Sequence, residues 1–350
     1  MMEGKTVSRV AARRVGEDLA EAVREVMELA DWRRHLDLSK PVLLKPNLGW
    51  DNFLPGAVTS PAVLDAVIRV LRPHASTLLV VEADQVLVRC EKALRKAGAD
   101  RVCEQHGIPF VNLSREPMVS VPLGGEVFPE IRLPRLLLDA NLVTIPVMKT
   151  HDKTVVTGAL KNQWGCLDKV RHTYHLEVSR AIVELNQALR PRFAVMDATV
   201  SLEGNGPKSG RPRVTDLVLA SGDLVALDAT AARLMGFDPA RIEHLQIAQQ
   251  AGLGCAQPGG IELLGDPVGD LNFGFRPARS NLVSVVELKL RRSRLKQVVF
   301  AGPIFWLACR GALVFYFFWY HLVGRRFRNE ILRHPRYGAQ WRRPSPETDR

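Results

Sequence analysis

Short apolar runs alternate along the chain with segments whose apolar residues recur at helical spacing. The runs predict strands at 41–45, 77–81, 141–148, 192–196 and 214–220. The helical spacing predicts helices at 15–31, 61–72, 86–106, 176–190 and 224–235, the second opened by the capping triplet Thr59-Ser60-Pro61. Residues 108–135, rich in Pro, Gly and short alternating runs, suggest a β-hairpin insertion. This order predicts an α/β fold over 1–288, with a mostly parallel sheet flanked by helices.

The basic charge of the chain is confined to its C-terminal part. Residues 1–287 carry 34 Lys and Arg against 34 Asp and Glu, whereas residues 288–350 carry 14 against 3. The excess therefore adjoins the most apolar run of the chain, Val298–Val323. Positive charge beside a hydrophobic run favours an anionic membrane surface over nucleic acid, and we expect no nucleic-acid partner.

The run Val298–Val323 is long enough to span a bilayer, with Arg310 at its centre. Basic residues flank it on both sides, so the positive-inside rule prefers neither orientation. A re-entrant or interfacial segment with both ends cytoplasmic fits this pattern best, and a buried core or oligomer-interface helix is the alternative. The N-terminus lacks the apolar stretch of a signal peptide. We therefore expect a protein at the cytoplasmic face of the membrane, with 289–350 as its membrane-associated segment and tail.

Polar residues follow four of the predicted strands directly. The pairs of strand and polar end are PVLL with Lys45-Pro46-Asn47, TLLVV with Glu82-Ala83-Asp84, LVTIPVM with Lys149-Thr150-His151, and RFAVM with Asp197-Ala198-Thr199. Parallel strands bring their carboxyl ends to one edge of a sheet, where ligands bind. These residues are predicted to converge on one site, and ordinary solvated strand ends are the alternative.

The densest group of candidate residues lies in KTHDKTVVTGALKNQWGCL, residues 149–167. Lys149, His151, Lys161 and Asn162 supply cations and hydrogen-bond donors, and the glycines permit close backbone approach. Such a loop suits a phosphate or carboxylate group. A solvated basic loop is the alternative.

A glycine-rich turn, EGNGPKSG, occupies residues 203–210. Gly204 and Gly206 could form a backbone nest for an anion, while Asp197 and Glu203 could hold a hard cation such as Mg²⁺ or Mn²⁺. An ordinary turn explains the glycines as well. Asp228 stands among apolar residues at helical spacing, where an unpartnered carboxylate is costly.

These segments together resemble the DUF362 family. The blocks are LLKPN, then IPVMKTH with ALKN, then MDA with EGNGP, then SGD with ALDA and MG, over roughly residues 40–260. The resemblance implies an α/β domain, and some members are associated with 4Fe–4S clusters through an added cysteine-rich module. The five cysteines of this chain are scattered, with no CxxC, so we do not expect such a cluster.

The sequence thus predicts a membrane-associated enzyme acting on a small anionic ligand. A ligand-binding or scaffold protein without turnover and an iron–sulfur redox protein are the alternatives. The cofactor, the reaction class and the oligomeric state stay open. The expected catalytic residues are Lys149, His151, Asp197 and Asp228; the expected substrate-binding residues are Lys45, Asn47, Lys161, Asn162, Gly204 and Gly206; the expected metal ligands are Asp197 and Glu203.

Overall fold

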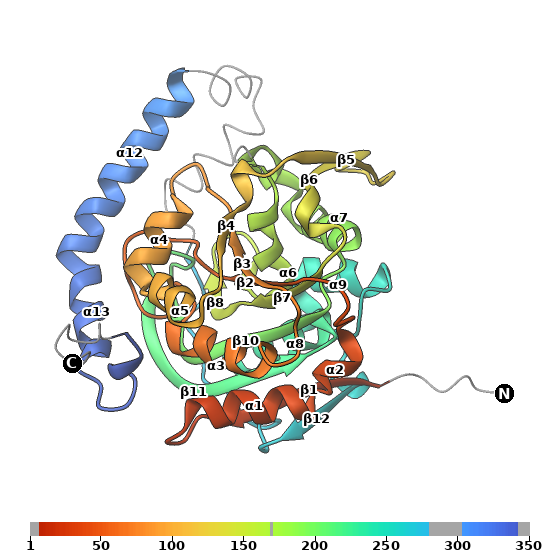
Figure 1. The fold of residues 1–350 in the computed structure, drawn as a ribbon. Coiled ribbons are helices and arrows are strands. Elements are labelled where there is room, and N and C mark those ends of the chain that lie inside the picture. Colours follow the sequence, from red (N-terminus) through yellow and green to blue (C-terminus); the bar gives the residue numbers. More distant parts are fainter. Residues whose placement is uncertain (1–6, 169–170, 280–302, 342–350) are drawn as a thin grey trace.

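A mixed sheet with helices on both faces forms the centre of the protein (Figure 1). The computed structural model describes residues 7–168, 171–279 and 303–341. The strand order is β12-β1-β11-β10-β7-β2-β3-β4, with β8 paired to β10 and β9 paired to β8. Among the described strands, six of the nine pairings in this sheet are parallel, which confirms the predicted α/β class.

The strands are short except for two long central ones. They are β1 (Ser8–Arg14), β2 (Val42–Pro46), β3 (Leu78–Glu82), β4 (Phe110–Asn112), β7 (Asn141–Ile145), β8 (Val147–His151), β9 (Val155–Thr157), β10 (Phe193–Glu203), β11 (Arg211–Ser221) and β12 (Ile261–Gly265). A separate hairpin, β5 (Met118–Pro122) with β6 (Glu130–Pro134), lies inside the segment for which an insertion was expected.

The helices form two layers around the sheet. One apolar core joins the first layer to side chains such as Val42, Leu44 and Val195, and a second core joins the other layer to Ala194, Met196 and Leu219. The first layer contains α1 (Leu19–Leu29), α3 (Pro61–Leu71), α4 (Cys90–Ala97) and α5 (Ala99–His106), and the second contains α6 (Ala159–Asn162), α7 (Val178–Leu189), α8 (Leu224–Met235) and α9 (Glu243–Gln250).

Two predicted elements are interrupted in the structure. The strand expected over 141–148 is divided at Pro146 into β7 and β8, because proline has no N–H for the ladder. The helix expected over 86–106 is divided at Gly98, whose φ of 83° ends α4 in the left-handed region. The break at Pro146 lets β7 pair with β2 while β8 follows β10, which places Lys149 beside Leu202.

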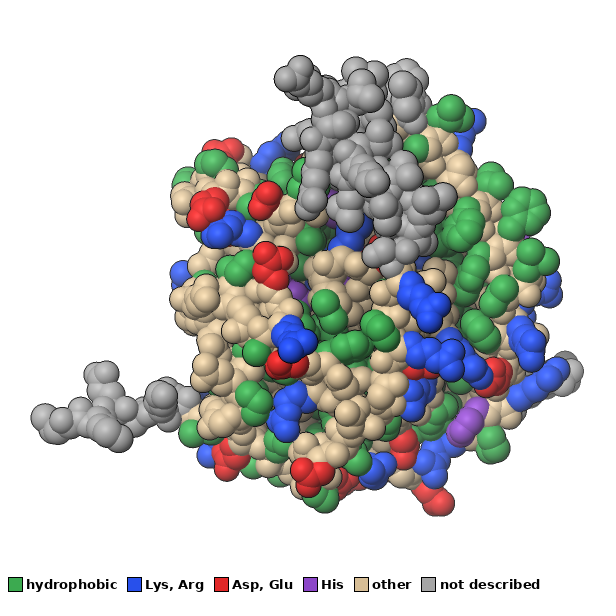
Figure 2. Space-filling view, turned by 180° about the vertical axis from the view of Figure 1, so that it is seen from behind, with side chains coloured by type: hydrophobic (Ala, Val, Ile, Leu, Met, Phe, Trp, Pro, Cys, Tyr) green, Lys and Arg blue, Asp and Glu red, His purple; other side chains and the backbone are tan. Residues whose placement is uncertain are grey.

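The apolar C-terminal segment forms α12 (Pro303–Trp319), a π-helical turn (Tyr320–Gly324) and α13 (Arg325–Leu332). Residues 298–302 of the predicted run lie outside the described residues. Within the described part, the stretch Phe305–Leu332 is long and apolar enough to cross a membrane, and only 11% of its most apolar window is buried. Figure 2 shows hydrophobic side chains in a column at the right-hand edge, where α12 lies. The exposed fractions reach 71% for Leu307 and 76% for Leu322.

The residues after α12 pack into the domain and are not a separable tail. Tyr320, Ile331, Tyr337 and Trp341 are buried, and the last three belong to the same core as α1 and α3. Replacing a buried aromatic residue by alanine typically costs about 3–5 kcal/mol. A chain truncated after Lys289 is therefore expected to lose part of its core.

Candidate functional site

A buried ion pair links the ends of β2 and β3. Lys45 Nζ lies 2.9 Å from Glu82 Oε2, and the two side chains are 1% and 3% exposed. Glu82 also accepts hydrogen bonds from the backbone N–H groups of Leu48 and Ala83. A Cβ at Gly165 would overlap Glu82 Oε1 and lie 2.6 Å from Lys45 Nζ, so only glycine fits against this pair. Lys45 is thus neutralised within the protein.

Two asparagines connect this pair to the next strands. Asn47 Nδ2 donates to Asn162 Oδ1 (3.1 Å), and Asn162 Nδ2 donates to Lys45 O (3.0 Å) and to Thr144 Oγ1 (2.7 Å). All of these groups are buried. Because each amide is held by two partners, the network fixes the relative positions of β2, β7 and α6.

Lys149 extends from β8 into the same network. Its Nζ donates to Asn47 Oδ1 (3.0 Å) and to Ala57 O (2.8 Å), and the side chain is 1% exposed. Both partners are uncharged, so no carboxylate neutralises the ammonium directly. Burial, followed by the charges of Lys208 and Lys161, lowers the pKa of Lys149 to about 7.

Lys161, on α6, is the second buried lysine without a carboxylate in hydrogen-bond contact among the described residues. Its Nζ lies 5.4 Å from the centre of the Trp164 ring, within the range of a cation–π contact. Burial lowers its pKa to about 7, because Asp152 only partly offsets it and Lys153 and Arg171 act in the same direction as burial. Two lysines that titrate near neutrality therefore lie in one buried region.

Asp228 positions the helix that carries Lys161. Its two carboxylate oxygens accept from the N–H groups of Ala159 (2.6 Å) and Leu160 (2.9 Å), and a Cβ at Gly158 would overlap Oδ1. Burial raises the pKa of Asp228 to about 7 although both N–H donors favour the ionised form. Both oxygens of Asp228 thus hold the start of α6, and its expected catalytic role stays a prediction.

His151 ends β8 in a neutral form. Burial and the surrounding Lys161, His175 and Lys153 hold its pKa well below the usual range. Its Nδ1 lies 3.0 Å from the Lys153 backbone N and 3.1 Å from Asp152 Oδ1. The first contact suits a ring with its proton on Nε2, and the second suits a ring with its proton on Nδ1. In either form the neutral ring carries one N–H donor.

The glycine-rich turn packs directly on β8. Thr150 Oγ1 donates to Gly204 O (2.8 Å), and a Cβ at Gly206 would overlap Thr150 O. These two glycines permit the close approach of the turn to the strand. The approach brings Lys208, from the same turn, so near that its charge lowers the pKa of Lys149 more than any other charge does.

Asp197 and Glu203 lie apart from each other. They are six positions apart on β10, which corresponds to roughly 20 Å. Asp197 accepts from Ser60 N (2.8 Å) and Thr199 Oγ1 (2.7 Å) at the start of α3, and Glu203 pairs with Arg213 (3.2 Å). They cannot share one Mg²⁺ or Mn²⁺ ion in this arrangement. In the part of the chain that the structure describes, no group of three His, Cys, Asp or Glu side chains is placed to bind a metal.

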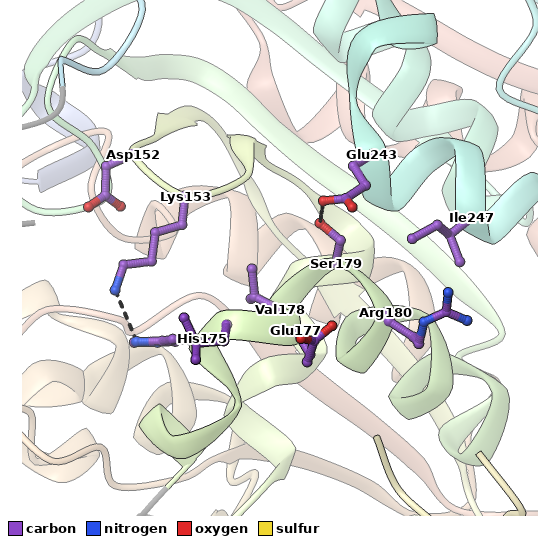
Figure 3. Close-up of a pocket in the computed structure, with 10 residues that line it drawn as sticks. Asp152, Lys153, His175, Glu177, Val178, Ser179, Arg180, Glu243 and Ile247 are labelled. Carbon is purple, nitrogen blue, oxygen red and sulfur yellow. Dashed lines mark hydrogen bonds between the residues drawn. The ribbon is translucent and has the colours of Figure 1, made fainter. Parts of the chain in front are cut away.

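A polar pocket of about 270 Å³ lies beside this region, between the β8–β9 turn, the start of α7 and α9 (Figure 3). Lys153 Nζ is 3.0 Å from His175 Nδ1, and Ser179 Oγ donates to Glu243 Oε2 (2.7 Å). The His175 ring stacks on Trp164, with the centroids 6.4 Å apart. Because Trp164 also contacts Lys161, the wall of the pocket adjoins the buried lysines.

The structure therefore brings together Lys45, Asn47, Lys149, His151, Lys161 and Asn162 from the predicted set. We call Lys45, Lys149, Lys161 and Lys208 the lysine cluster. Glu82 and Lys208 were not among the expected catalytic, substrate-binding or metal-binding residues, although Glu82 belongs to one of the predicted polar strand ends. Glu82 follows a strand directly, as Lys45 does, and Lys208 lies in the glycine-rich turn. These positions in the sequence could have identified Glu82 and Lys208 as candidate site residues.

The family model described as "Domain of unknown function (DUF362)" matches residues 42–233, more than half of the chain. A thylakoid-associated protein of Synechocystis sp. is 29% identical over 229 residues, which are 61% of this chain and 68% of that protein. The lactate racemase apoprotein from Thermoanaerobacterium thermosaccharolyticum matches 67% of this chain and 59% of its own, with 13% identity and a TM-score of 0.42. At that score, nothing about activity follows from the likeness.

Proposed function

The chain belongs to the DUF362 family, and we propose that this member is a membrane-associated protein that binds a small phosphate- or carboxylate-bearing ligand at its lysine cluster. The supporting observation is the charge balance of the buried site. Lys149 and Lys161 lie among Lys45, Lys208 and Arg171. Two carboxylates offset these charges in part, since Glu82 contacts Lys45 directly and Asp152 acts on Lys161. Like charges brought together at low dielectric are stabilised by an anion.

We further propose that the site is catalytic. A lysine with a pKa near 7 can both accept and donate a proton at neutral pH, which suits acid–base chemistry on a bound anion. His151 would donate its ring N–H to the same anion. In this proposal Lys149 or Lys161 transfers the proton, and the asparagine pair Asn47 and Asn162 holds Lys149 and α6 in place.

Ligand binding without turnover is the second candidate. It is favoured by the placement of Asp197 and Asp228, because the carboxylates expected to act as acid or base are both engaged by backbone N–H groups. The two candidates differ in one observable. Incubation of the protein with extracts of small molecules and lipids, followed by mass spectrometry, would reveal a product that is lost in Lys149→Met if the site is catalytic.

Membrane attachment rests on α12 in this proposal. Its outward-facing apolar side chains are exposed, and the Synechocystis relative is thylakoid-associated by name. Tyr316 and Trp319 of α12 and the following Tyr320 pack on Trp50 of the domain, and basic residues flank the apolar run on both sides. An interfacial segment at the cytoplasmic face is therefore the arrangement we propose.

The anion site is tested by calorimetric titration of sulfate, whose charge is constant across neutral pH. The full-length protein in mild nonionic detergent is compared with Lys149→Met and with Lys40→Met, an exposed lysine before the amino end of β2, the end opposite to Lys45. We expect saturable binding to the parent and to Lys40→Met, and at least about tenfold weaker binding to Lys149→Met. Equal binding by all three proteins, or none by any, would refute the proposal.

A further inference from the structure

The two faces of α12 contact different surroundings. Phe305, Cys309, Ala312, Tyr316 and Trp319 recur every three or four residues and are partly buried on one side of the helix. The opposite side is exposed along its length and apolar except for Arg310, as Trp306 (53%), Val314 (55%) and Phe317 (56%) show. This second face has no protein partner among the described residues, and its composition is that of a helix lying in a membrane interface.

The inner face of α12 contacts the loop that covers Lys149. The Trp50 ring lies 5.8 Å from Tyr316, 5.7 Å from Trp319 and 6.3 Å from Tyr320. Tyr320 Oη also donates to Phe53 O (2.8 Å). The same loop provides Ala57 O, which accepts from Lys149. The membrane-facing helix and the buried lysine are thus separated by one loop.

Lys208, a member of the lysine cluster, also lies next to α12. Its Nζ lies 5.5 Å from the Tyr316 ring, and its charge acts on the pKa of Lys149 more than any other charge does. Lys208 is partly exposed, whereas Lys149 is buried. Cationic groups therefore continue from the surface beside α12 into the buried site.

The surface charge next to α12 is also suited to an anionic membrane. Arg325, Arg326 and Arg328 lie in the first turn of α13, after the π-helical turn that follows α12, and Arg211 lies 5.6 Å from the Phe327 ring of α13. A basic group near the membrane surface contributes about 1 kcal/mol of attraction to anionic lipids in general. An apolar face with a basic margin would hold the protein with Lys208 at the level of lipid headgroups.

We infer that the ligand of the lysine cluster is the anionic headgroup of a membrane amphiphile, which enters from the bilayer beside α12 and past Lys208. This inference rests on the proposed function and specifies its substrate class. The headgroup would carry a phosphate or carboxylate, and the acyl chains would stay against the exposed face of α12. A soluble anion would need no such apolar surface next to the entrance.

The test measures acetylation of Lys149 by an activated ester, read by mass spectrometry, with Lys40 as the internal control. The full-length protein is exposed to phosphatidylcholine vesicles, to vesicles that also contain phosphatidylglycerol, or to soluble glycerol 3-phosphate at a matched concentration. We expect phosphatidylglycerol vesicles to slow labelling of Lys149 by about tenfold, and phosphatidylcholine vesicles and glycerol 3-phosphate to have little effect. Labelling of Lys40 should not change.

The double variant Leu307→Gln/Phe317→Gln, altered only on the exposed face of α12, should lose protection by vesicles. If glycerol 3-phosphate protects Lys149 from acetylation as well as vesicles do, or if vesicles still protect Lys149 in the double variant, the proposed amphiphile ligand is refuted. The proposed anion site would stand in either case. If neither phosphatidylglycerol nor glycerol 3-phosphate protects Lys149 and sulfate does not bind, the proposed function fails as well.

Discussion

Replacing Lys149 by methionine should change the pH dependence of stability. Methionine keeps the length of the side chain and removes its charge. In the parent, burial and neighbouring lysines lower the pKa of Lys149 from 10.5 to about 7. A depression of that size means that the folded state disfavours the charged form by roughly 4–5 kcal/mol. Lys149→Met removes this cost of the buried charge, but it also loses the hydrogen bonds to Asn47 and Ala57, at about 1–3 kcal/mol each. Below pH 7 the gain and the loss in stability therefore nearly cancel.

Above pH 7 the cancellation ends. The unfolded chain keeps the Lys149 proton up to a pH of about 10.4, while the folded protein releases it near pH 7. Because the unfolded state then binds more protons, the stability of the parent rises with pH through this window, by up to ~1.4 kcal/mol per pH unit. The variant lacks this contribution. Lys149→Met should therefore become less stable than the parent by a further ~2–3 kcal/mol between about pH 7 and pH 9.

The measurement is urea-induced unfolding in mild nonionic detergent, followed by tryptophan fluorescence at the two pH values. Lys40→Met serves as the matched control, since its side chain is exposed, and should follow the parent at both pH values. Lys161 titrates in the same window but is present in all three proteins, so its effect is common to them. A stability difference between parent and Lys149→Met that is equal at both pH values would refute the depressed pKa and the reasoning built on it.

Three further changes test the surroundings of the cluster. Lys45→Met should leave the Glu82 carboxylate buried without its ion-pair partner, which should lower the free energy of unfolding by about 3–5 kcal/mol. Urea unfolding measures this loss, and the double variant Lys45→Met/Glu82→Gln should recover part of the lost stability. Gly165→Ala should place a methyl group against this ion pair and weaken sulfate binding measured by calorimetry; unaltered binding would contradict the packing. Asp228→Asn should cost about 1–3 kcal/mol by leaving one N–H of α6 without an acceptor. Because burial raises the pKa of Asp228 to about 7, the parent loses stability as pH rises from about 4 to 7, and the variant should not.

The sheet was predictable from the sequence where apolar runs are long and buried. The central strands follow such runs, and their polar ends converge as parallel topology requires. The strands β1 and β12 were not predicted. The sequence of β1, SRVAARR, carries three arginines and gains its strand conformation by pairing with β11 and β12. That pairing spans more than 200 residues, and local periodicity contains no signal for it.

Lys45, Lys149, Lys161 and the two asparagines of the candidate site were predicted from the sequence, but Lys208 and the surroundings of the carboxylates were not. Asp197 and Asp228 accept hydrogen bonds from backbone N–H groups at the starts of α3 and α6. These contacts depend on which helix end packs against each carboxylate, and the sequence does not show that. The register shift in β10 between Ala198 and Val200 also changes which side chains share a face. The apolar C-terminal run was recognised, but the return of Tyr337 and Trp341 to the core could not be read from composition.

Anomalous diffraction from selenate, a heavy analogue of sulfate, tests the central claim most directly. Crystals of the full-length protein grown with selenate at about pH 6, where Lys149 and Lys161 are charged, should show an anomalous peak within hydrogen-bond distance, about 2.7–3.2 Å, of at least one of these two lysines. The peak should be absent from Lys149→Met crystals grown in the same way. Selenate bound only at exposed arginines, with no density at the lysine cluster, would contradict the account.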